Sequence, residues 1–85
     1  MSDVIVALDF PIQDGEGKTI TELKIRRPKV KDLRAAQSQK TEADQELFLL
    51  SKLTGLVMED IAELDIADYQ KVQNVLKEMQ KGKSK

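Results

Sequence analysis

The fold class follows from residues 4–28, which read VIVALDFPIQDGEGKTITELKIRRP. Apolar residues alternate through the first part of this segment, as they do in a strand with one buried face. Asp14-Gly15 then offers the positive-φ positions that a tight hairpin turn needs. Residues 19–27 predict a second strand, which Pro28 ends because proline has no N–H to donate. A two-stranded hairpin is marginally stable alone in water, so helices are expected to cover it.

The buried face of the hairpin can be read from its apolar positions. On the second strand, Leu23 and Ile25 point the same way, whereas Ile20 falls out of this parity. The second strand is therefore expected to bulge or to begin at Thr21. On the first strand, the residues expected to share one face are Val4, Val6, Leu8 and Phe10.

Helical patterns fill the remaining chain. Helices are expected over residues 30–39, 42–54, 59–64 and 66–81. Thr41 and Asp65 stand where N-caps belong. Gly55 suits a helix C-terminus, and Leu56 after it is placed for the apolar contact of a Schellman motif.

Together these patterns predict one small α+β domain over residues 1–85. An N-terminal β-hairpin at about 4–27 precedes three to four α-helices at about 30–81. Gly82 is expected to end the last helix and to leave a frayed basic tail at 82–85.

The composition excludes several kinds of chemistry. The 85 residues include no Cys and no His, which removes thiolate nucleophiles, zinc–thiolate sites and the commonest general base. Neither a signal peptide nor an apolar run of about 18 residues is present, so the chain is expected in the cytoplasm, without membrane contact. No catalytic residue, metal site or cofactor is predicted, and an enzyme is not expected.

One group of carboxylates could in principle hold a divalent cation or hydrolyse sugars. The D-x-D-x-D-G spacing of a calcium loop is absent, and three aromatic residues cannot build a sugar-binding platform. Four of the five acids stand where caps and first-turn acids belong, so the group is interpreted as structural. Its members are Glu59, Asp60, Glu63, Asp65 and Asp68.

Two apolar stretches could serve either the core or a partner. Residues 47–50 read LFLL, and four successive apolar residues span about 300° of a helix. This helix either lies between the hairpin and the last helix or keeps one side for a partner. Along the last helix, a stripe of Ile66, Tyr69, Val72, Leu76 and Met79 suits a core, although its spacing also suits helix–helix association. The candidate partner-binding residues are Leu47, Phe48, Leu49, Leu50, Tyr69, Val72 and Leu76.

Charge is segregated along the chain although the net charge is −1. Residues 1–40 carry a net +2, residues 41–70 a net −7 and residues 71–85 a net +4. The basic end could contact nucleic acid or an acidic surface, but lysines near a helix C-terminus also offset its dipole. Nucleic acid is not expected as a partner, because no arginine cluster or interleaved aromatic residue accompanies these lysines.

Four motifs follow one another in the chain: Ile20-Thr21-Glu22-Leu23, the segment RRPKVKDLRAA at 26–36, Leu53-Thr54-Gly55-Leu56 and LDIADY at 64–69. In this order they resemble the tail assembly chaperones of contractile-tailed, Mu-like bacteriophages. The resemblance covers about residues 4–80 and has two departures from the family pattern. Lys29 replaces a helix-capping Thr, and the lead-in to the short helix lacks a Thr-Pro pair.

The resemblance implies a non-enzymatic protein that binds the tape-measure protein, a long helical chain rich in apolar surface, and keeps it soluble. It implies action in the host cytoplasm and absence from the mature virion. It also implies a frameshift-extended form of the chain, for which Lys81-Gly82-Lys83 permits a slippery codon run. A homo-oligomer is a further possible partner state.

Two other functions compete with this interpretation. A small DNA-binding phage regulator would use the helices at 30–39 and 42–54, but acids on the second of these would repel phosphate. A structural tail component would be present in purified virions.

Overall fold

The computed structural model describes residues 3–81. The strands are β1 (Val4–Gln13) and β2 (Thr19–Ile25), and the helices are α1 (Val30–Ala36), α2 (Glu42–Thr54), α3 (Met58–Ile61) and α4 (Ile66–Gln80). The prediction of an α+β fold with an N-terminal hairpin and three to four helices is confirmed. Gly82 and the basic tail at 82–85 lie outside the described residues.

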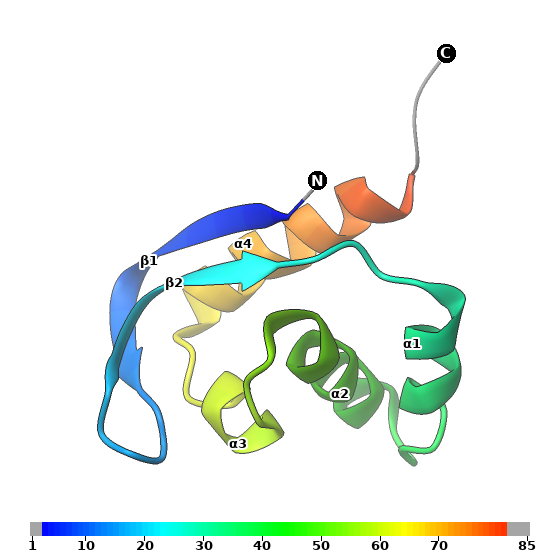
Figure 1. Ribbon diagram of the computed structural model, residues 1–85, viewed down its shortest axis with the longest axis horizontal. Helices are drawn as coiled ribbons and strands as arrows, with labels where there is room; N and C mark the ends of the chain where they lie inside the picture. The colour runs from blue at the N-terminus through cyan, green and yellow to red at the C-terminus, as the bar shows by residue number, and fades with distance from the viewer. Residues whose placement is uncertain (1–2, 82–85) are drawn as a thin grey trace.

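The hairpin arches over the helices, with α4 running beneath β1 and α1 lying at the end away from the hairpin turn (Figure 1). α2 packs against α1, α3 and β2. A single aliphatic cluster joins the inner face of the hairpin to α2 and α4, and burying each such side chain contributes about 1.5–3 kcal/mol. Its buried members are Val6, Leu8, Ile12, Leu23, Ile25, Ala36, Leu49, Leu50, Leu53, Ile61, Val72, Leu76 and Met79.

The antiparallel register of the hairpin shifts once, and the extra residues lie on β1. Ala7 pairs with Glu22 and Ile12 with Ile20, so β1 advances five residues while β2 advances two. The expectation that β2 begins at Thr21 is wrong, because the strand begins at Thr19. The alternative, a bulge, agrees with the register shift between Glu22 and Ile20, although the extra residues lie on β1 and not on β2. The buried residues of β1 keep one parity, at Val6, Leu8 and Ile12, but the irregularity changes the parity of the β2 residues opposite them, so that Ile12 pairs with Ile20.

The predicted buried face of β1 is only half right. Val6 and Leu8 are buried, but Phe10 is 55% exposed and Val4 at the strand end is 37% exposed. The hairpin turn also differs in detail, because Gly17 and not Gly15 has a positive φ, of 86°. The Asp14 carboxylate accepts the N–H groups of Glu16 and Lys18, both at 2.9 Å, which closes the turn from the side chain.

The first turn of α4 holds the irregular part of β1. Asp68 is fully buried, and its two carboxylate oxygens accept the N–H groups of Asp9 and Phe10, each at 2.9 Å. Lys71 donates to the Ala7 carbonyl at 2.8 Å and lies 3.4 Å from the Asp68 carboxylate. Burial by itself raises the pKa of Asp68, but these N–H donors and Lys71 outweigh it, so its pKa lies below the ordinary value.

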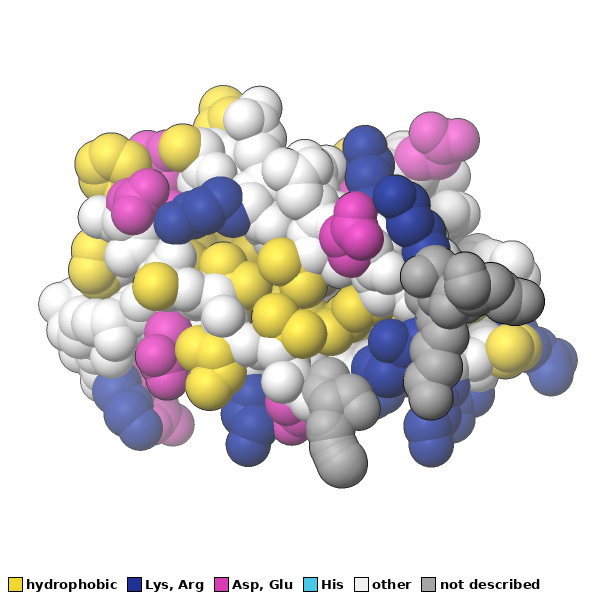
Figure 2. Space-filling model, turned by 90° about the horizontal axis from the view of Figure 1, so that it is seen from above, with side chains coloured by type: hydrophobic (Ala, Val, Ile, Leu, Met, Phe, Trp, Pro, Cys, Tyr) yellow, Lys and Arg dark blue, Asp and Glu magenta, His cyan; other side chains and the backbone are white. Residues whose placement is uncertain are grey.

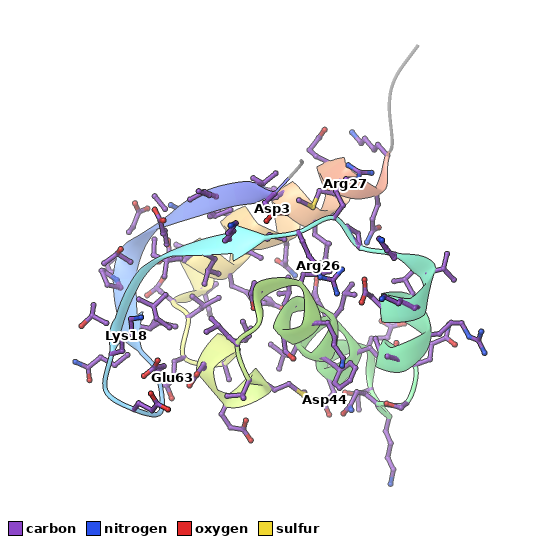
Figure 3. All side chains as sticks on the ribbon, in the orientation of Figure 1. Asp3, Lys18, Arg26, Arg27, Asp44 and Glu63 are labelled. Carbon is purple, nitrogen blue, oxygen red and sulfur yellow. The ribbon has the colours of Figure 1, made fainter. Side chains whose placement is uncertain are left out.

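A second polar junction joins β2, α1 and the end of α4. Arg26 forms a bidentate pair with Asp32, Nη1 to Oδ2 at 2.9 Å and Nη2 to Oδ1 at 2.8 Å. The Asp32 carboxylate also accepts the Lys29 N–H at 2.8 Å. Lys29 was expected to be a weak N-cap for this helix, and the hydrogen bond to Asp32 stabilises the same helix end. Arg27 donates to the Met79 carbonyl at 2.9 Å, and Figure 3 shows the two arginines lying between these elements.

The predicted helix caps agree with the structure better than the predicted helix lengths do. Thr41 accepts the Asp44 N–H at 3.1 Å, and Asp65 accepts the Ala67 N–H at 2.9 Å, so both N-caps are confirmed. Gly55 has φ 80° and ends α2, as predicted. Its N–H donates to the Ser51 carbonyl, which is the hydrogen bond of the αL motif and not of the expected Schellman motif.

Two predicted helices are longer than the observed ones. α1 stops at Ala36, and the polar residues after it form turns; α3 is one turn, Met58–Ile61. Among residues 3–81, no helix combines the length and the apolar character that crossing a membrane requires.

Candidate partner-binding groove

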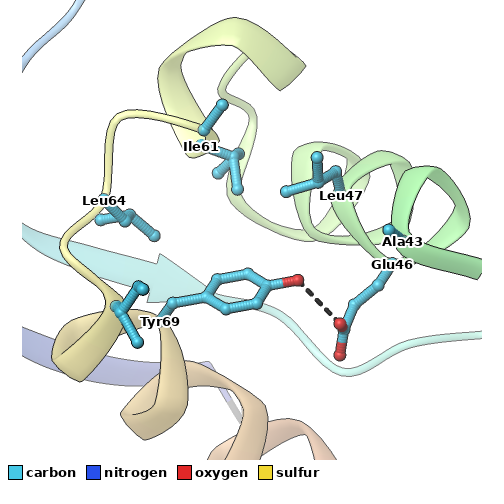
Figure 4. A pocket seen from close by; sticks show the side chains of 8 residues that line it. Ala43, Glu46, Leu47, Ile61, Leu64 and Tyr69 are labelled. Atoms are coloured by element: carbon cyan, nitrogen blue, oxygen red, sulfur yellow. Dashed lines mark hydrogen bonds between the residues drawn. The ribbon is translucent and has the colours of Figure 1, made fainter.

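An open groove of about 360 Å³ lies where α2, α3 and the start of α4 meet. We call it the apolar groove; its lining residues are Ala43, Glu46, Leu47, Ile61, Ala62, Leu64, Ile66 and Tyr69. The α2 residues at positions 43, 46 and 47 have the i, i+3, i+4 spacing of one helix face. Figure 4 shows Leu47, Ile61 and Leu64 converging beside the ring of Tyr69.

The groove has a buried floor and an exposed rim. Ile61 of α3 is almost completely buried, whereas Leu47 and Leu64 are half-buried. Ile66, the first residue of α4, is 74% exposed, so the prediction that it belongs to the core stripe is wrong. An aliphatic side chain this exposed at the rim of an apolar groove is available to a partner.

One polar network forms the wall between α2 and α4. The Glu46 carboxylate accepts the Tyr69 hydroxyl at 2.7 Å and the Gln73 amide at 3.1 and 3.3 Å. Burial raises the pKa of Tyr69, and the adjacent carboxylate raises it further, so the phenol stays protonated and donates. The network therefore holds the Tyr69 ring in a fixed position at the groove wall (Figure 4).

Acidic residues are neighbours of the groove-lining residues in the sequence. Glu46 is the only charged residue among those that line it within the described chain. Further acids alternate with the lining residues in sequence and are exposed, and Figure 3 places Asp44 on α2 and Glu63 beside α3. These exposed acids, the acidic rim, are Glu42, Asp44, Glu63 and Asp65.

The structure distributes the seven sequence candidates over three environments. Leu47 and Tyr69 line the apolar groove, and Phe48 is half-buried beside the core with the Lys52 ammonium 5.5 Å from its ring centre. Leu49, Leu50, Val72 and Leu76 are buried. Because these four side chains are buried, direct contact with a partner is expected mainly at Leu47, Phe48 and Tyr69. Partner binding itself stays a prediction.

A second cavity of about 430 Å³, between α1, α2 and α4, has a more polar lining. Leu49 and Leu76 reach it, and Glu46 lines it as well as the apolar groove. Glutamine and glutamate side chains fill much of its wall, which makes it the poorer place for an apolar partner.

Other apolar side chains are exposed away from the groove. β1 exposes Val4, Ile5 and Phe10, and α1 exposes Val30 and Leu33. Seen from above, hydrophobic side chains gather at the centre of the face, and lysines and arginines gather toward one end (Figure 2). Val30 and Leu33 line a further hollow with Arg27 and Lys29, whereas the apolar groove has a mostly aliphatic lining with Glu46 as its charged residue.

The carboxylate group does not act as a unit. Asp65 caps α4, Asp68 anchors β1, and Glu59 and Asp60 lie in the first turn of α3. No three His, Cys, Asp or Glu side chains of residues 3–81 gather as a metal site would require. The structural interpretation is right for caps and first-turn acids, but the strand contact of Asp68 was missed.

Several groove residues were also missed from the sequence. Ala43 and Glu46 lie seven and four residues before the fully buried Leu50, and this helical spacing was a usable signal. Ile61 is the last residue of a helix of one turn, and Leu64 follows it; a helix this short shows no periodicity.

Comparison with known proteins agrees with the motifs in the chain. No curated protein and no solved structure matches it significantly. Residues 6–81 match the family described as "Phage tail assembly chaperone proteins, E, or 41 or 14", which is nearly the whole chain. The matched range contains β1 from Val6 onward, the whole of β2, all four described helices and every residue of the apolar groove. The chain therefore belongs to the phage tail assembly chaperone family.

Proposed function

We propose that this chaperone binds the tape-measure protein non-covalently and keeps it soluble until the tail is built. The observation that carries the proposal is the apolar groove, an open aliphatic hollow on a chain whose family acts in tail assembly. A long helical protein with exposed apolar stripes would self-associate unless those stripes were covered. Helix-in-groove binding covers them without changing any covalent bond.

The groove supports reversible binding. It offers one rigid aromatic ring, Tyr69, and half-buried aliphatic side chains such as Leu47 and Leu64. Each aliphatic anchor buried from a partner contributes about 1.5–3 kcal/mol, against which the entropy of association must be set. A few such anchors give binding that holds during assembly and still allows release.

Co-expression with the tape-measure protein of the same genome tests this function, with a tag on this chain only. We expect the tape-measure protein to become soluble and to co-purify with the tag. An insoluble tape-measure protein and no co-purification would contradict the proposal, provided that the frameshift-extended form of this chain fails in the same assay. Reading the codons for residues 81–83 shows whether the slippery run for that form exists.

The proposed function includes a place and a time of action. The chaperone would act in the host cytoplasm and leave before the virion is complete. Mass spectrometry of purified virions tests this, since a structural tail component would be detected there and a chaperone would not. Detection in a fixed ratio to other tail proteins would contradict the proposal.

A further inference from the structure

We infer that the apolar groove takes an amphipathic helix with an aliphatic stripe and a flanking lysine or arginine, and that Glu46 selects that cation. The inference rests on the proposed function only for the identity of the protein that carries the helix. It goes further in stating what the bound segment must look like, and it assigns Glu46 as a specificity-determining residue.

The shape and lining of the groove determine the apolar part of the ligand. Its walls come from helices on three sides, and its lining is aliphatic apart from Glu46 and the phenol of Tyr69. Such a groove accepts residues from one face of a helix, at i, i+3, i+4 and i+7. The exposed Ile66 at the rim extends the apolar surface beyond the floor.

Glu46 determines the polar part. A carboxylate has about four acceptor sites. Oε1 takes the Tyr69 hydroxyl and the closer Gln73 bond, whereas Oε2 takes only the 3.3 Å Gln73 bond. Oε2 therefore keeps acceptor capacity, on a carboxylate that Tyr69 and Gln73 already hold in place. A group oriented in advance loses little entropy when a cation binds it.

The charges around the groove favour the same ligand. The acidic rim adds Glu42, Asp44, Glu63 and Asp65, and residues 41–70 carry a net −7. Lys52, the one basic residue of this segment, lies over Phe48, and Lys71, which follows the segment, contacts β1 and Asp68. A helix flanked by lysine or arginine is attracted to this surface, and a helix flanked by glutamate is repelled.

A second copy of the chain is the main competing occupant. Its α1 exposes Val30 and Leu33 beside Lys29, Lys31 and Arg34. However, α1 has only seven residues, and the Arg26–Asp32 pair ties it to β2, so it presents two apolar side chains rather than a stripe. A longer helix from another protein fits the groove better, and the experiment below separates the two.

Two synthetic peptides test the inference by fluorescence anisotropy. Both are helices of about 20 residues, hence about 30 Å long, with the same leucine stripe. They differ only in the flanking residues, which are lysine in one and glutamate in the other. We expect the lysine helix to bind about tenfold more tightly than the glutamate helix at low salt, and we expect salt to narrow this preference. Equal binding of the two helices, or no binding of either, would overturn the inference.

Two substitutions with matched controls locate the effect. Glu46→Gln keeps an oxygen for the Tyr69 hydroxyl but removes the charge, so it should reduce the preference for lysine about fivefold. Asp44→Asn, on the same helix but outside the groove, should reduce it less. Ile66→Ser should weaken both peptides, whereas Ile5→Ser, at an exposed position on β1, should weaken neither. If Glu46→Gln matches Asp44→Asn, or Ile66→Ser matches Ile5→Ser, the assignment of the groove fails.

The same variants keep this inference separate from the proposed function. If the tape-measure protein co-purifies equally with wild type and with Ile66→Ser, tape-measure binding stands and the groove assignment fails. If the lysine helix binds at the groove but the tape-measure protein is never recovered, the groove stands and the proposed function fails. Concentration-dependent self-association that Ile66→Ser abolishes, with no peptide binding, would overturn the inference in favour of a second copy.

Discussion

Arg26 and Asp32 form a bidentate ion pair that joins the end of β2 to the first turn of α1, with both N–O distances under 3 Å. Asp32 is buried, while the Arg26 side chain is 37% exposed. The pair lies within the RRPKVKDL segment that carries the family resemblance, so the motif has a structural explanation. It fixes the direction of the chain as it leaves the hairpin, and hence the position of α1 against α2.

This pair makes stability depend on acid pH. Hydrogen bonds from Arg26 and the Lys29 N–H lower the pKa of Asp32 from 3.8 to about 2. A lowered pKa in the folded state stabilises the fold above the unfolded pKa, and this contribution is lost as pH falls toward about 2. We expect Asp32→Asn to cost about 1 kcal/mol at neutral pH, a figure reduced for the exposure of Arg26. Urea unfolding should show that the difference in free energy of unfolding between wild type and Asp32→Asn becomes smaller from about pH 4 to about pH 2. A constant difference across that range would contradict the assignment.

The Asp68 anchor should be among the most sensitive positions in the chain. Asp68→Ala leaves the N–H groups of Asp9 and Phe10 without acceptors beside a buried space, and unpaired buried donors are costly. We expect a clear fall in the urea midpoint and faster hydrogen exchange at these two amides. Glu78→Gln, at an exposed ion pair, is the control and should leave both unchanged. An Asp68→Ala variant as stable as this control would show that the anchor is dispensable.

Polar substitution should unfold the protein at Leu49 and leave its stability nearly unchanged at Ile66. Leu49 is 5% exposed, so Leu49→Asp buries a charge and should abolish the helical circular dichroism signal. Ile66 is the exposed first residue of α4, so Ile66→Ser should change the free energy of unfolding by less than about 0.5 kcal/mol. A folded Leu49→Asp variant would contradict the burial of that side chain and would return Leu49 to the partner surface.

The acidic residues of α2 should prevent binding to nucleic acid. α2 carries Glu42, Asp44 and Glu46 against Lys52, so a phosphate backbone would be repelled rather than bound. We expect the protein to pass through a heparin column at low salt. Retention that salt reverses would contradict this and would favour the DNA-binding regulator.

Local interactions explain why much of the fold can be predicted from the chain. The Thr41 cap, the Asp65 cap and the Gly55 stop each involve residues two to four positions apart, so the residue types themselves indicate the structure. The alternation at Leu23 and Ile25 likewise depends only on neighbours, and these residues are buried as predicted. Hairpin, helices and fold class follow from such short-range rules.

Contacts between distant residues decide the remainder. The extra residues of β1 give no local signal, because their N–H groups find an acceptor on Asp68, 59 positions away from Asp9. Ile66 has the spacing of a core residue, yet a side chain is buried only where another element lies opposite, and at the first turn of α4 none covers it. The apolar groove depends on the same condition, since it exists only where α2, α3 and α4 meet without filling the space between them.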